Sequence, residues 1–286
     1  MATVSIVVPA KNEADNLKHW LPRLVEQGGY DELIIVDDGS IDSTADVAHE
    51  NGAKVIRHEQ SMGNGASIKR GFRETTSEWV LFMDGDGQHQ PEDIPRFLEA
   101  MQSTGADMVV GARDSEGQAS KGRLVANMFY NRFASLLTGG KVEDLTSGFR
   151  LVKADKFRQF LNLLPNKFSY PTTSTMAFFR SGYPVKYISV DVKKRTGKSH
   201  IHPLKDGARF LVIIFKVATL YSPLKVFLPI SAGLFLLGLA RYVYTYIEMG
   251  SFTNMSALLM VSALQVFLVG LVSEQITSLI YKDSGH

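Results

Sequence analysis

Cysteine is missing from the 286 residues, and this absence excludes disulfide bonds and thiolate metal sites. Tryptophan is scarce, with two residues. Charged residues are almost absent between 226 and 280, whereas residues 1 to about 205 carry charges throughout. The formal net charge of +2 therefore averages two unlike regions. We expect a soluble α/β domain followed by a membrane-embedded segment.

A long apolar run is also missing at the N-terminus. The run Val4–Val8 is followed at once by Lys11, Glu13 and Asp15. A signal peptide needs a longer apolar core, so we interpret this run as a first β-strand. The soluble part is therefore expected to stay in the cytoplasm.

The first half of the chain alternates between β-type and α-type patterns. Helical periodicity covers 14–26 and 92–103, and β-rich runs occur at 4–8, 33–37, 54–57, 79–83 and 107–111. This alternation predicts parallel strands joined by right-handed crossovers. Ligands bind such sheets at the carboxyl ends of the strands. Polar motifs follow three of these strands, so we expect them to share one edge of the sheet: Pro9–Glu13, Asp37–Ser40 and Asp84–Gly87.

The C-terminal part contains two long apolar segments. Leu224–Ile247 and Ala257–Ile280 are each long enough to cross a bilayer about 30 Å thick. Arg241 can snorkel, whereas Gln265 and Glu274 require polar partners or an interface. A hairpin buried in a soluble protein is the alternative interpretation.

Basic residues precede the first apolar segment, and the link 248–254 has no Lys or Arg. The positive-inside rule therefore places both ends of the hairpin in the cytoplasm. The stretch 205–220 has apolar residues on one helical face, which predicts an interfacial helix, with an ordinary packed helix as the alternative. We expect a catalytic domain at 1–203, a juxtamembrane amphipathic helix at 204–223 and a two-helix anchor at 224–286.

The motif Asp84-Gly85-Asp86 follows the apolar strand Trp79–Met83. Two carboxylates at a strand end can hold a hard divalent cation beside a diphosphate. Gln88 and His89 could add ligands or hydrogen bonds. A solvated turn is the alternative, because a lone Asp-x-Asp pair is a weak signal.

The motif Asp37-Asp38-Gly39-Ser40 also ends a strand. We assign Asp38 to a ligand, because its carboxylate can accept hydrogen bonds from a nucleobase or a ribose. Asp42 or Ser43 is assigned to the cap of a helix at 44–51. Gly63-Asn64-Gly65 precedes another helix and could hold phosphate, but it lacks Walker A spacing, and a turn fits equally well.

Taken in order, these motifs resemble those of the family 2 GT-A glycosyltransferases. The resemblance is carried by Val7–Glu13, Val36–Ser40, Asp84–Glu92 and Arg113. Within that family the chain most resembles the polyprenyl-phosphate glycosyltransferases, which include the dolichol-phosphate mannose synthases and bacterial relatives that transfer glucose or aminoarabinose. The resemblance implies a GT-A Rossmann-like, parallel-dominated sheet, followed by the interfacial helix and two transmembrane helices.

The resemblance also implies roles for individual residues. Pro9, Glu13 and Asp38 would contact the nucleoside, with Lys11 and Gly85 in the same donor-binding motifs. Asp86 and Gln88 would bind Mg²⁺ or Mn²⁺, with Asp84 just behind. The acceptor phosphate would lie near Arg113, Arg123 and Asn127, and a basic loop would fold over the diphosphate with Lys194, Arg195 and His200.

Two residues depart from the family pattern. Many mannose synthases have an aromatic residue at the position of Lys11, so base stacking is not expected there. The loop motif usually has Arg three residues before its glycine, where this chain has Lys194, and Arg195 is one residue closer to Gly197. Either of the two can reach the phosphate.

The implied reaction is inverting transfer of a hexose from a nucleotide-sugar, of the UDP-glucose or GDP-mannose type, to a polyprenyl phosphate. It would occur at the cytoplasmic face of the inner membrane, so the expected partners are donor, acceptor and lipid bilayer. The resemblance also allows a homo-oligomer, and no nucleic-acid partner is expected.

Three other functions are considered. A processive polysaccharide synthase would carry a Gln-x-x-Arg-Trp motif and more spans, but Trp20 and Trp79 lie outside such a context. A transferase acting on another lipid or a soluble acceptor remains open. A non-catalytic nucleotide-sugar-binding scaffold is disfavoured, because the set Asp84, Asp86, Gln88 and Arg113 is intact.

Overall fold

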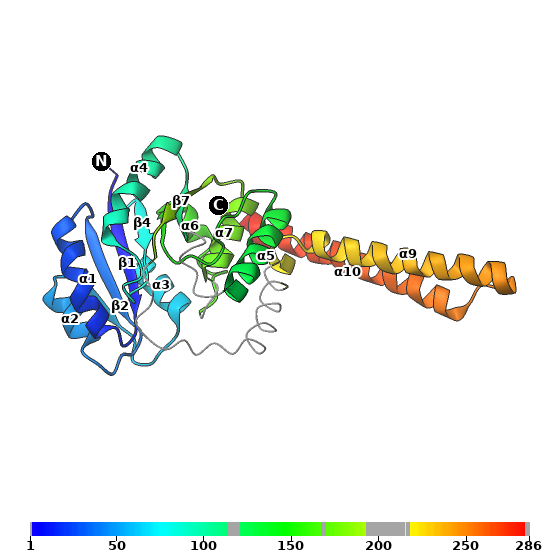
Figure 1. Ribbon diagram of the computed structural model, residues 1–286, viewed down its shortest axis with the longest axis horizontal. Coiled ribbons are helices and arrows are strands. Elements are labelled where there is room, and N and C mark those ends of the chain that lie inside the picture. The colour runs from blue at the N-terminus through cyan, green and yellow to red at the C-terminus, as the bar shows by residue number, and fades with distance from the viewer. Residues whose placement is uncertain (1, 114–120, 167–169, 193–214, 216–217, 284–286) are drawn as a thin grey trace. The chain divides into compact units, whose positions relative to one another are not determined.

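The chain forms two compact units, Met1–His202 and Pro203–His286, each described by itself (Figure 1). The structure is a computed structural model that describes residues 2–113, 121–166, 170–192, 215 and 218–283. For 121–127 and 280–283 only the backbone is described. Within the described part, the first unit carries a single mixed sheet and the second a pair of long helices.

The sheet of the first unit has seven strands in the order β3-β2-β1-β4-β6-β5-β7. Only β6 runs antiparallel to its neighbours β4 and β5, and all other pairs are parallel. The parallel-dominated α/β sheet expected from the sequence is therefore confirmed. The strands are β1 (Val4–Ala10), β2 (Glu32–Asp37), β3 (Lys54–Arg57), β4 (Trp79–Phe82), β5 (Met108–Arg113), β6 (Arg150–Lys153) and β7 (Val185–Val190).

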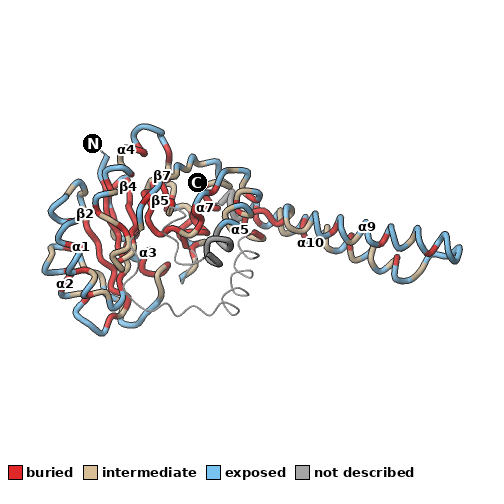
Figure 2. The backbone as a smooth tube through the Cα atoms, in the orientation of Figure 1, coloured by how far each residue is buried: buried red, intermediate tan, exposed pale blue. Residues whose placement is uncertain are grey.

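Alternate residues of a strand point to opposite faces of the sheet, so each face carries side chains that need to be covered. Helices cover both faces. Ile6 and Val8 pack in one cluster with Leu17 of α1 and Phe97 of α4. On the other face, the ring of Phe82 packs against helices α3, α6 and α7 through Phe72, Phe157 and Tyr170. Figure 2 shows the buried strands between these layers. The helices are α1 (Ala14–Gln27), α2 (Thr44–Glu50), α3 (Asn64–Arg73), α4 (Ile94–Thr104), α5 (Lys121–Thr138), α6 (Ala154–Gln159) and α7 (Tyr170–Arg180), with a 3₁₀ turn η1 (Pro91–Asp93).

The strand order reverses at β1. The chain first builds β2 and β3 on one side of β1 and then places β4 on the other side. Ligand crevices in such sheets form outside the carboxyl ends of the strands at this reversal. The polar motifs after β1, β2 and β4 lie at that edge, and β5 runs in the same direction and brings Arg113 to it.

The sequence analysis missed β6. This strand is four residues long and begins with Arg150, which is completely buried. A buried arginine interrupts the apolar pattern by which short interior strands are recognised. As a result, the antiparallel insertion between β4 and β5 could not be read from periodicity.

The second unit contains the hairpin of α9 (Pro223–Met249) and α10 (Asn254–Asp283). Residues 223–249 and 254–279 are long and apolar enough to cross a membrane. Ser231 Oγ donates to the carbonyl of Ala263 at 2.8 Å, so the helices also contact through polar groups. The polar partner expected for Glu274 is found at the start of α9, where Leu224 N donates to Glu274 Oε2 at 3.2 Å.

Most of the expected helix at 204–223 lies outside the described residues. Residues 218–221 are helical, and the non-helical Ser222 separates them from the start of α9. The interfacial helix therefore stays a prediction.

Candidate functional site

The turns after β1 and β2 are locked together at the carboxyl edge of the sheet. Asn12, with φ +54°, donates its N–H to Ser40 Oγ at 2.9 Å and accepts from the Ile41 N–H at 2.9 Å. Glu13 N donates to Thr44 Oγ1 at 2.9 Å. The turn that carries Pro9, Lys11 and Glu13 is thus fixed by protein contacts, and the Lys11 side chain is exposed at its tip.

Asp42 joins the starts of two helices. Its carboxylate accepts from Ala14 N in the first turn of α1 at 3.2 Å and from Thr44 N in α2 at 3.1 Å. Burial would raise the pKa of Asp42, but hydrogen bonds led by Thr44 and Ala14 lower it. Of the two capping candidates, Ser43 occupies the N-cap of α2 without a side-chain cap bond. Asp42 therefore supplies the side-chain acceptor.

Asp38 lies almost fully buried after β2, with 5% of its surface exposed. Its Oδ1 lies 2.8 Å from His58 Nδ1 and 2.8 Å from Met62 N, and Oδ2 accepts from Ser61 Oγ at 2.7 Å and Gly63 N at 2.9 Å. Burial alone would raise the pKa of Asp38, but these bonds, led by that from His58, lower it to about 2. The carboxylate is therefore ionised and already bound to the segment 58–63.

The Asp84-Gly85-Asp86 motif begins just beyond β4 and lies against the end of β1. A Cβ at Gly85 would stand 3.0 Å from Pro9 O, so the close approach of the two strand ends needs glycine. Trp20 Nε1 donates to Gly85 O at 3.2 Å, and Asp86 Oδ1 accepts from Gln88 N at 3.2 Å. The structure thus brings Asp84, Gly85, Asp86 and Gln88 into one short turn beside Pro9.

His89 lies beneath this turn. Its ring stacks on Phe149 at 4.7 Å between centroids, and Asp84 N donates to His89 Nδ1 at 3.2 Å. Burial lowers the pKa of His89 to about 4, although nearby Asp86 opposes this shift. His89 is therefore neutral and uses Nδ1 to hold the backbone of Asp84, which leaves Gln88 as the better of the two auxiliary ligand candidates.

The oxygen donors of this turn suit a hard divalent cation. Asp86 and Gln88 can offer carboxylate and amide oxygens, with Asp84 beside them, and Mg²⁺ prefers such ligands together with phosphate oxygens. Among the described residues no cluster of three or more His, Cys, Asp or Glu could hold a metal alone. The donor set therefore fits a cation that a bound diphosphate helps to coordinate.

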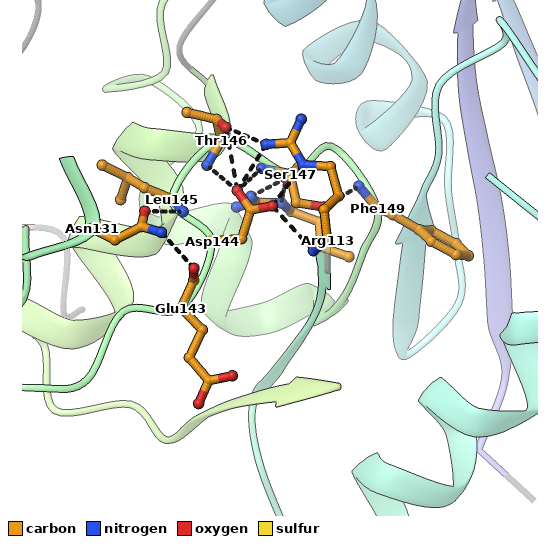
Figure 3. A network of polar contacts seen from close by, with 9 residues as sticks. Arg113, Asn131, Glu143, Asp144, Leu145, Thr146, Ser147 and Phe149 are labelled. Atoms are coloured by element: carbon orange, nitrogen blue, oxygen red, sulfur yellow. Dashed lines mark hydrogen bonds and ion pairs between the residues drawn. The ribbon is translucent and has the colours of Figure 1, made fainter. Parts of the chain in front are cut away.

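Arg113 at the end of β5 forms an ion pair with Asp144 (Figure 3). Its Nε and Nη2 donate to the two Asp144 oxygens at 2.7 and 2.9 Å, and Nη2 also donates to Thr146 Oγ1 at 2.5 Å. Burial would lower the pKa of Arg113 and raise that of Asp144, but the pair reverses both shifts. The bidentate contact fixes the plane of the guanidinium at the edge of the sheet.

The loop after Asp144 reaches the acidic turn. Asp144 Oδ1 accepts from Thr146 N and Ser147 N, at 3.0 and 3.1 Å. Next along the chain, a Cβ at Gly148 would stand 2.6 Å from Asp84 Oδ2. Only glycine leaves room there for the Asp84 carboxylate.

The buried guanidinium of Arg150 holds this loop in place by hydrogen bonds. Arg150 Nη1 donates to Pro171 O at 2.9 Å and Ser174 Oγ at 2.7 Å, and its Nε donates to Ser147 O at 3.2 Å. Tyr170 donates its hydroxyl to Gly148 O at 3.2 Å. Burial lowers the pKa of Arg150 and raises that of Tyr170, and each group is held by hydrogen bonds.

Sequence reasoning missed Asp144, Arg150 and Tyr170 as parts of the site. The stretch 144–150 is visibly rich in turn residues. However, Asp144 is 31 residues from its partner Arg113, and this pairing depends on the antiparallel β6.

Several expected site residues lie outside the described part. Lys194, Arg195 and His200 fall within 193–214, and only the backbone is described for Arg123 and Asn127 in α5. Their assigned roles stay predictions.

We expect Asp144→Asn to lower the free energy of unfolding by about 2 kcal/mol, because asparagine leaves the Arg113 charge without its anionic partner. This value is below that of a fully buried pair, since 30% of the Arg113 side chain is exposed. The folded-state pKa of Asp144 is depressed, so its contribution is present above the unfolded pKa of about 4 and is lost on acidification. The difference from wild type in thermal unfolding should therefore shrink below about pH 4. Asp15→Asn, at an exposed pair with Lys18, is the control, and a pH-independent difference would contradict the ion-pair explanation.

Comparison with known proteins places this geometry in a family. Residues 5–161 match the family described as Glycosyl transferase family 2, and residues 222–279 match the one described as GtrB C-terminal hairpin. A dolichol-phosphate mannosyltransferase from Pyrococcus furiosus is 35% identical over 138 residues, which cover 46% of this chain and 38% of that protein. An undecaprenyl-phosphate mannosyltransferase from Micrococcus luteus is 28% identical over 211 residues, covering 68% and 86% of the two chains.

Solved structures agree on the fold. Glucosyl-3-phosphoglycerate synthase from Mycobacterium tuberculosis, in complex with Mn²⁺, UDP and glucosyl-3-phosphoglycerate, aligns with a TM-score of 0.60 at 20% identity. The alignment covers 76% of this chain and 80% of that one. The expected GT-A fold is thereby confirmed. The family match covers more than half of the chain, and the chain belongs to glycosyltransferase family 2.

Proposed function

We propose that this family 2 glycosyltransferase transfers a hexose from a nucleotide-sugar to a polyprenyl phosphate, with inversion at the anomeric carbon. The observation that carries the proposal is the union, in one chain, of the acidic turn Asp84–Gln88 with a hairpin of two membrane-length helices. Relatives named for dolichol and undecaprenyl phosphate support the acceptor class. The proposed donor is of the UDP-glucose or GDP-mannose type.

The donor would lie across the ends of β1, β2 and β4. Pro9, Lys11 and Glu13 are proposed to face the nucleoside, and Asp86 and Gln88 to hold Mg²⁺ or Mn²⁺ against the diphosphate. The cation would neutralise charge that develops on the leaving diphosphate. Asp84, held through its backbone by His89, would keep the turn in place. Lys194, Arg195 and His200 are proposed to close over the diphosphate.

The acceptor phosphate is assigned to Arg113, Arg123 and Asn127. A phosphate monoester has a second pKa of about 6, so its oxygen is already anionic at neutral pH, and no strong general base is required. That oxygen bonds to the anomeric carbon as the bond from this carbon to the diphosphate breaks, and a nucleoside diphosphate leaves. A single displacement inverts the configuration.

The test is transfer from UDP-glucose and GDP-mannose to a short polyprenyl phosphate by the purified full chain, with 3-phosphoglycerate as a soluble comparison. This comparison is needed because the structural neighbour was solved with a soluble phosphorylated product. Faster transfer to the soluble acceptor would overturn the lipid assignment.

We expect Asp86→Asn to lower turnover by at least about a hundredfold, because one carboxylate fewer weakens charge neutralisation at the diphosphate. Mn²⁺ binding, followed by electron paramagnetic resonance without substrate turnover, should weaken in parallel. Asp46→Asn, at an exposed carboxylate on α2, is the control. Full wild-type activity in excess chelator would refute the metal assignment.

We also propose that the catalytic domain and both termini lie on the cytoplasmic side of the inner membrane, because basic residues precede the hairpin. Cysteines introduced at Ser251 and Ser284 of this cysteine-free chain provide the test. A membrane-impermeant thiol reagent should label position 251, in the link between α9 and α10, from outside intact cells. Labelling of position 284 from outside would show that the topology is wrong.

Arg123→Ala should lower transfer to polyprenyl phosphate at least tenfold, while nucleotide affinity changes little. Two unit negative charges about 5 Å apart repel by roughly 3 kcal/mol at an effective dielectric near 20, which is worth about two orders of magnitude in rate. A guanidinium on the acceptor side would offset this repulsion. Arg132→Ala, at an exposed arginine of the same helix, is the control. A parallel loss of nucleotide affinity, measured by calorimetry, would move Arg123 to the donor site.

A further inference from the structure

The guanidinium of Arg113 is held by the protein along one edge. A guanidinium carries five N–H donors, one on Nε and two on each terminal nitrogen. Nε donates to Asp144 Oδ2 at 2.7 Å, and Nη2 donates to Asp144 Oδ1 at 2.9 Å and to Thr146 Oγ1 at 2.5 Å. In the part of the chain that the structure describes, Nη1 makes no hydrogen bond. The donors that remain for a ligand therefore belong to Nη1, on the side that points away from Asp144 (Figure 3).

The hydroxyl group of Thr146 closes this contact. Its Oγ1 accepts from Arg113 and donates to Asp144 Oδ1 at 3.2 Å, so the three side chains form a closed ring of hydrogen bonds. Without this hydroxyl, the second N–H of Nη2 would be open to an anion. The guanidinium could then bind a phosphate along more than one edge. The hydroxyl of Thr146 therefore decides which edge of Arg113 is presented to a ligand.

Helix α5 is fixed to the same loop. Asn131 accepts from Leu145 N at 3.0 Å and donates Nδ2 to Glu143 O at 2.5 Å (Figure 3). The α5 residues that we assign to the acceptor phosphate lie one and two turns before Asn131, so they share the helical face that contacts this loop. The loop thus connects the two groups of residues that are assigned to the acceptor.

The loop also contacts the donor motif. Gly148 follows Thr146 by two residues, and a Cβ there would stand 2.6 Å from Asp84 Oδ2. Burial lowers the pKa of Arg113, but the hydrogen bond and the charge of Asp144 raise it, and the charge of Asp84 adds to this rise. The free edge of Arg113 therefore lies within electrostatic reach of the acidic turn.

The orientation of the acceptor phosphate matters for a single displacement. The reacting atoms must approach to about 3–3.5 Å with aligned orbitals, and a misplacement of about 1 Å can lower the rate about a hundredfold. A guanidinium binds phosphate through N–H groups whose directions are fixed in one plane. The direction of the free edge of Arg113 therefore sets the direction in which the bound phosphate presents its oxygens.

We propose that Thr146 is a positioning residue, whose hydroxyl holds Arg113 so that Nη1 alone meets the phosphate of the acceptor. This inference rests on the acceptor part of the proposed function and deepens it by naming the residue that orients the cation. It predicts a defect in acceptor use that leaves the donor site unchanged. It also predicts that serine, which keeps the hydroxyl, can replace threonine.

The test compares Thr146→Val with Thr146→Ser in the purified full chain. Valine keeps the branched shape of threonine and lacks the hydroxyl. Thr146→Val should lower kcat/KM for a short polyprenyl phosphate about tenfold, the scale of one hydrogen bond to a charged group. Two donor-side measurements should stay within about twofold of wild type: hydrolysis of the nucleotide-sugar by water without acceptor, and calorimetric binding of the nucleoside diphosphate with Mn²⁺.

Two variants serve as controls for the loss of the hydroxyl. Thr146→Ser should stay within about threefold of wild type, because its hydroxyl can still bond to Arg113 and Asp144. Thr104→Val removes a hydroxyl that bonds to Ala100 O of its own helix at 2.6 Å, and it should leave transfer unchanged.

Wild-type kcat/KM in Thr146→Val would overturn the proposal. A parallel loss of transfer, hydrolysis and nucleotide affinity would also overturn it, because the hydroxyl would then support the whole site. Failure of the lipid assignment is visible separately, as faster transfer by the wild type to 3-phosphoglycerate than to polyprenyl phosphate. The defect of Thr146→Val should then appear with that soluble phosphate, and its absence there would overturn the proposal.

Discussion

Negative charge concentrated at one edge of the sheet is the constraint on which the rest of the site depends. Asp38, Asp42, Asp84 and Asp86 follow strands that end at this edge, and Asp144 precedes the antiparallel strand β6, which begins there. Carboxylates taken out of water are stable only when donors or cations replace their hydration. The backbone amides of Met62 and Gly63 do this for Asp38, and Arg113 does it for Asp144. The loops are therefore fixed by the same contacts that stabilise the charges.

The parallel strands and the position of the acidic motifs were predictable from the sequence. The strands are encoded locally, by apolar runs such as 4–8 that are followed by polar residues. The position of the acidic motifs follows from the rule that ligands bind at the carboxyl ends of parallel strands. The partners of the charged groups were not predictable. Arg113 pairs with a residue 31 positions away, and Asp38 pairs with the loop after the next strand. A sequence shows that a carboxylate is present, but it does not show whether its lone pairs are already occupied.

The hairpin was predictable for a different reason. Its length and lack of charge are themselves the signal, and helices α9 and α10 extend the expected spans by only a few residues at their ends. Glu274, the acidic residue near the end of the second apolar segment, accepts a hydrogen bond from the Leu224 amide in the first turn of α9. A helix N-terminus favours a nearby carboxylate. Glu274, for which the sequence required a polar partner, therefore links the two helices.

The antiparallel strand β6 has a consequence for how members of such a family can diverge. Helix α5 lies in the excursion between β5 and β6, and the ion pair between Arg113 and Asp144 brings the two ends of this excursion together. The strands that carry the donor motifs, β1, β2 and β4, are connected without it. Insertions or substitutions within the excursion can therefore accumulate without repacking the donor half. Chimeras that exchange this segment between relatives at the two ion-paired residues are therefore expected to keep the strands β1, β2 and β4 intact.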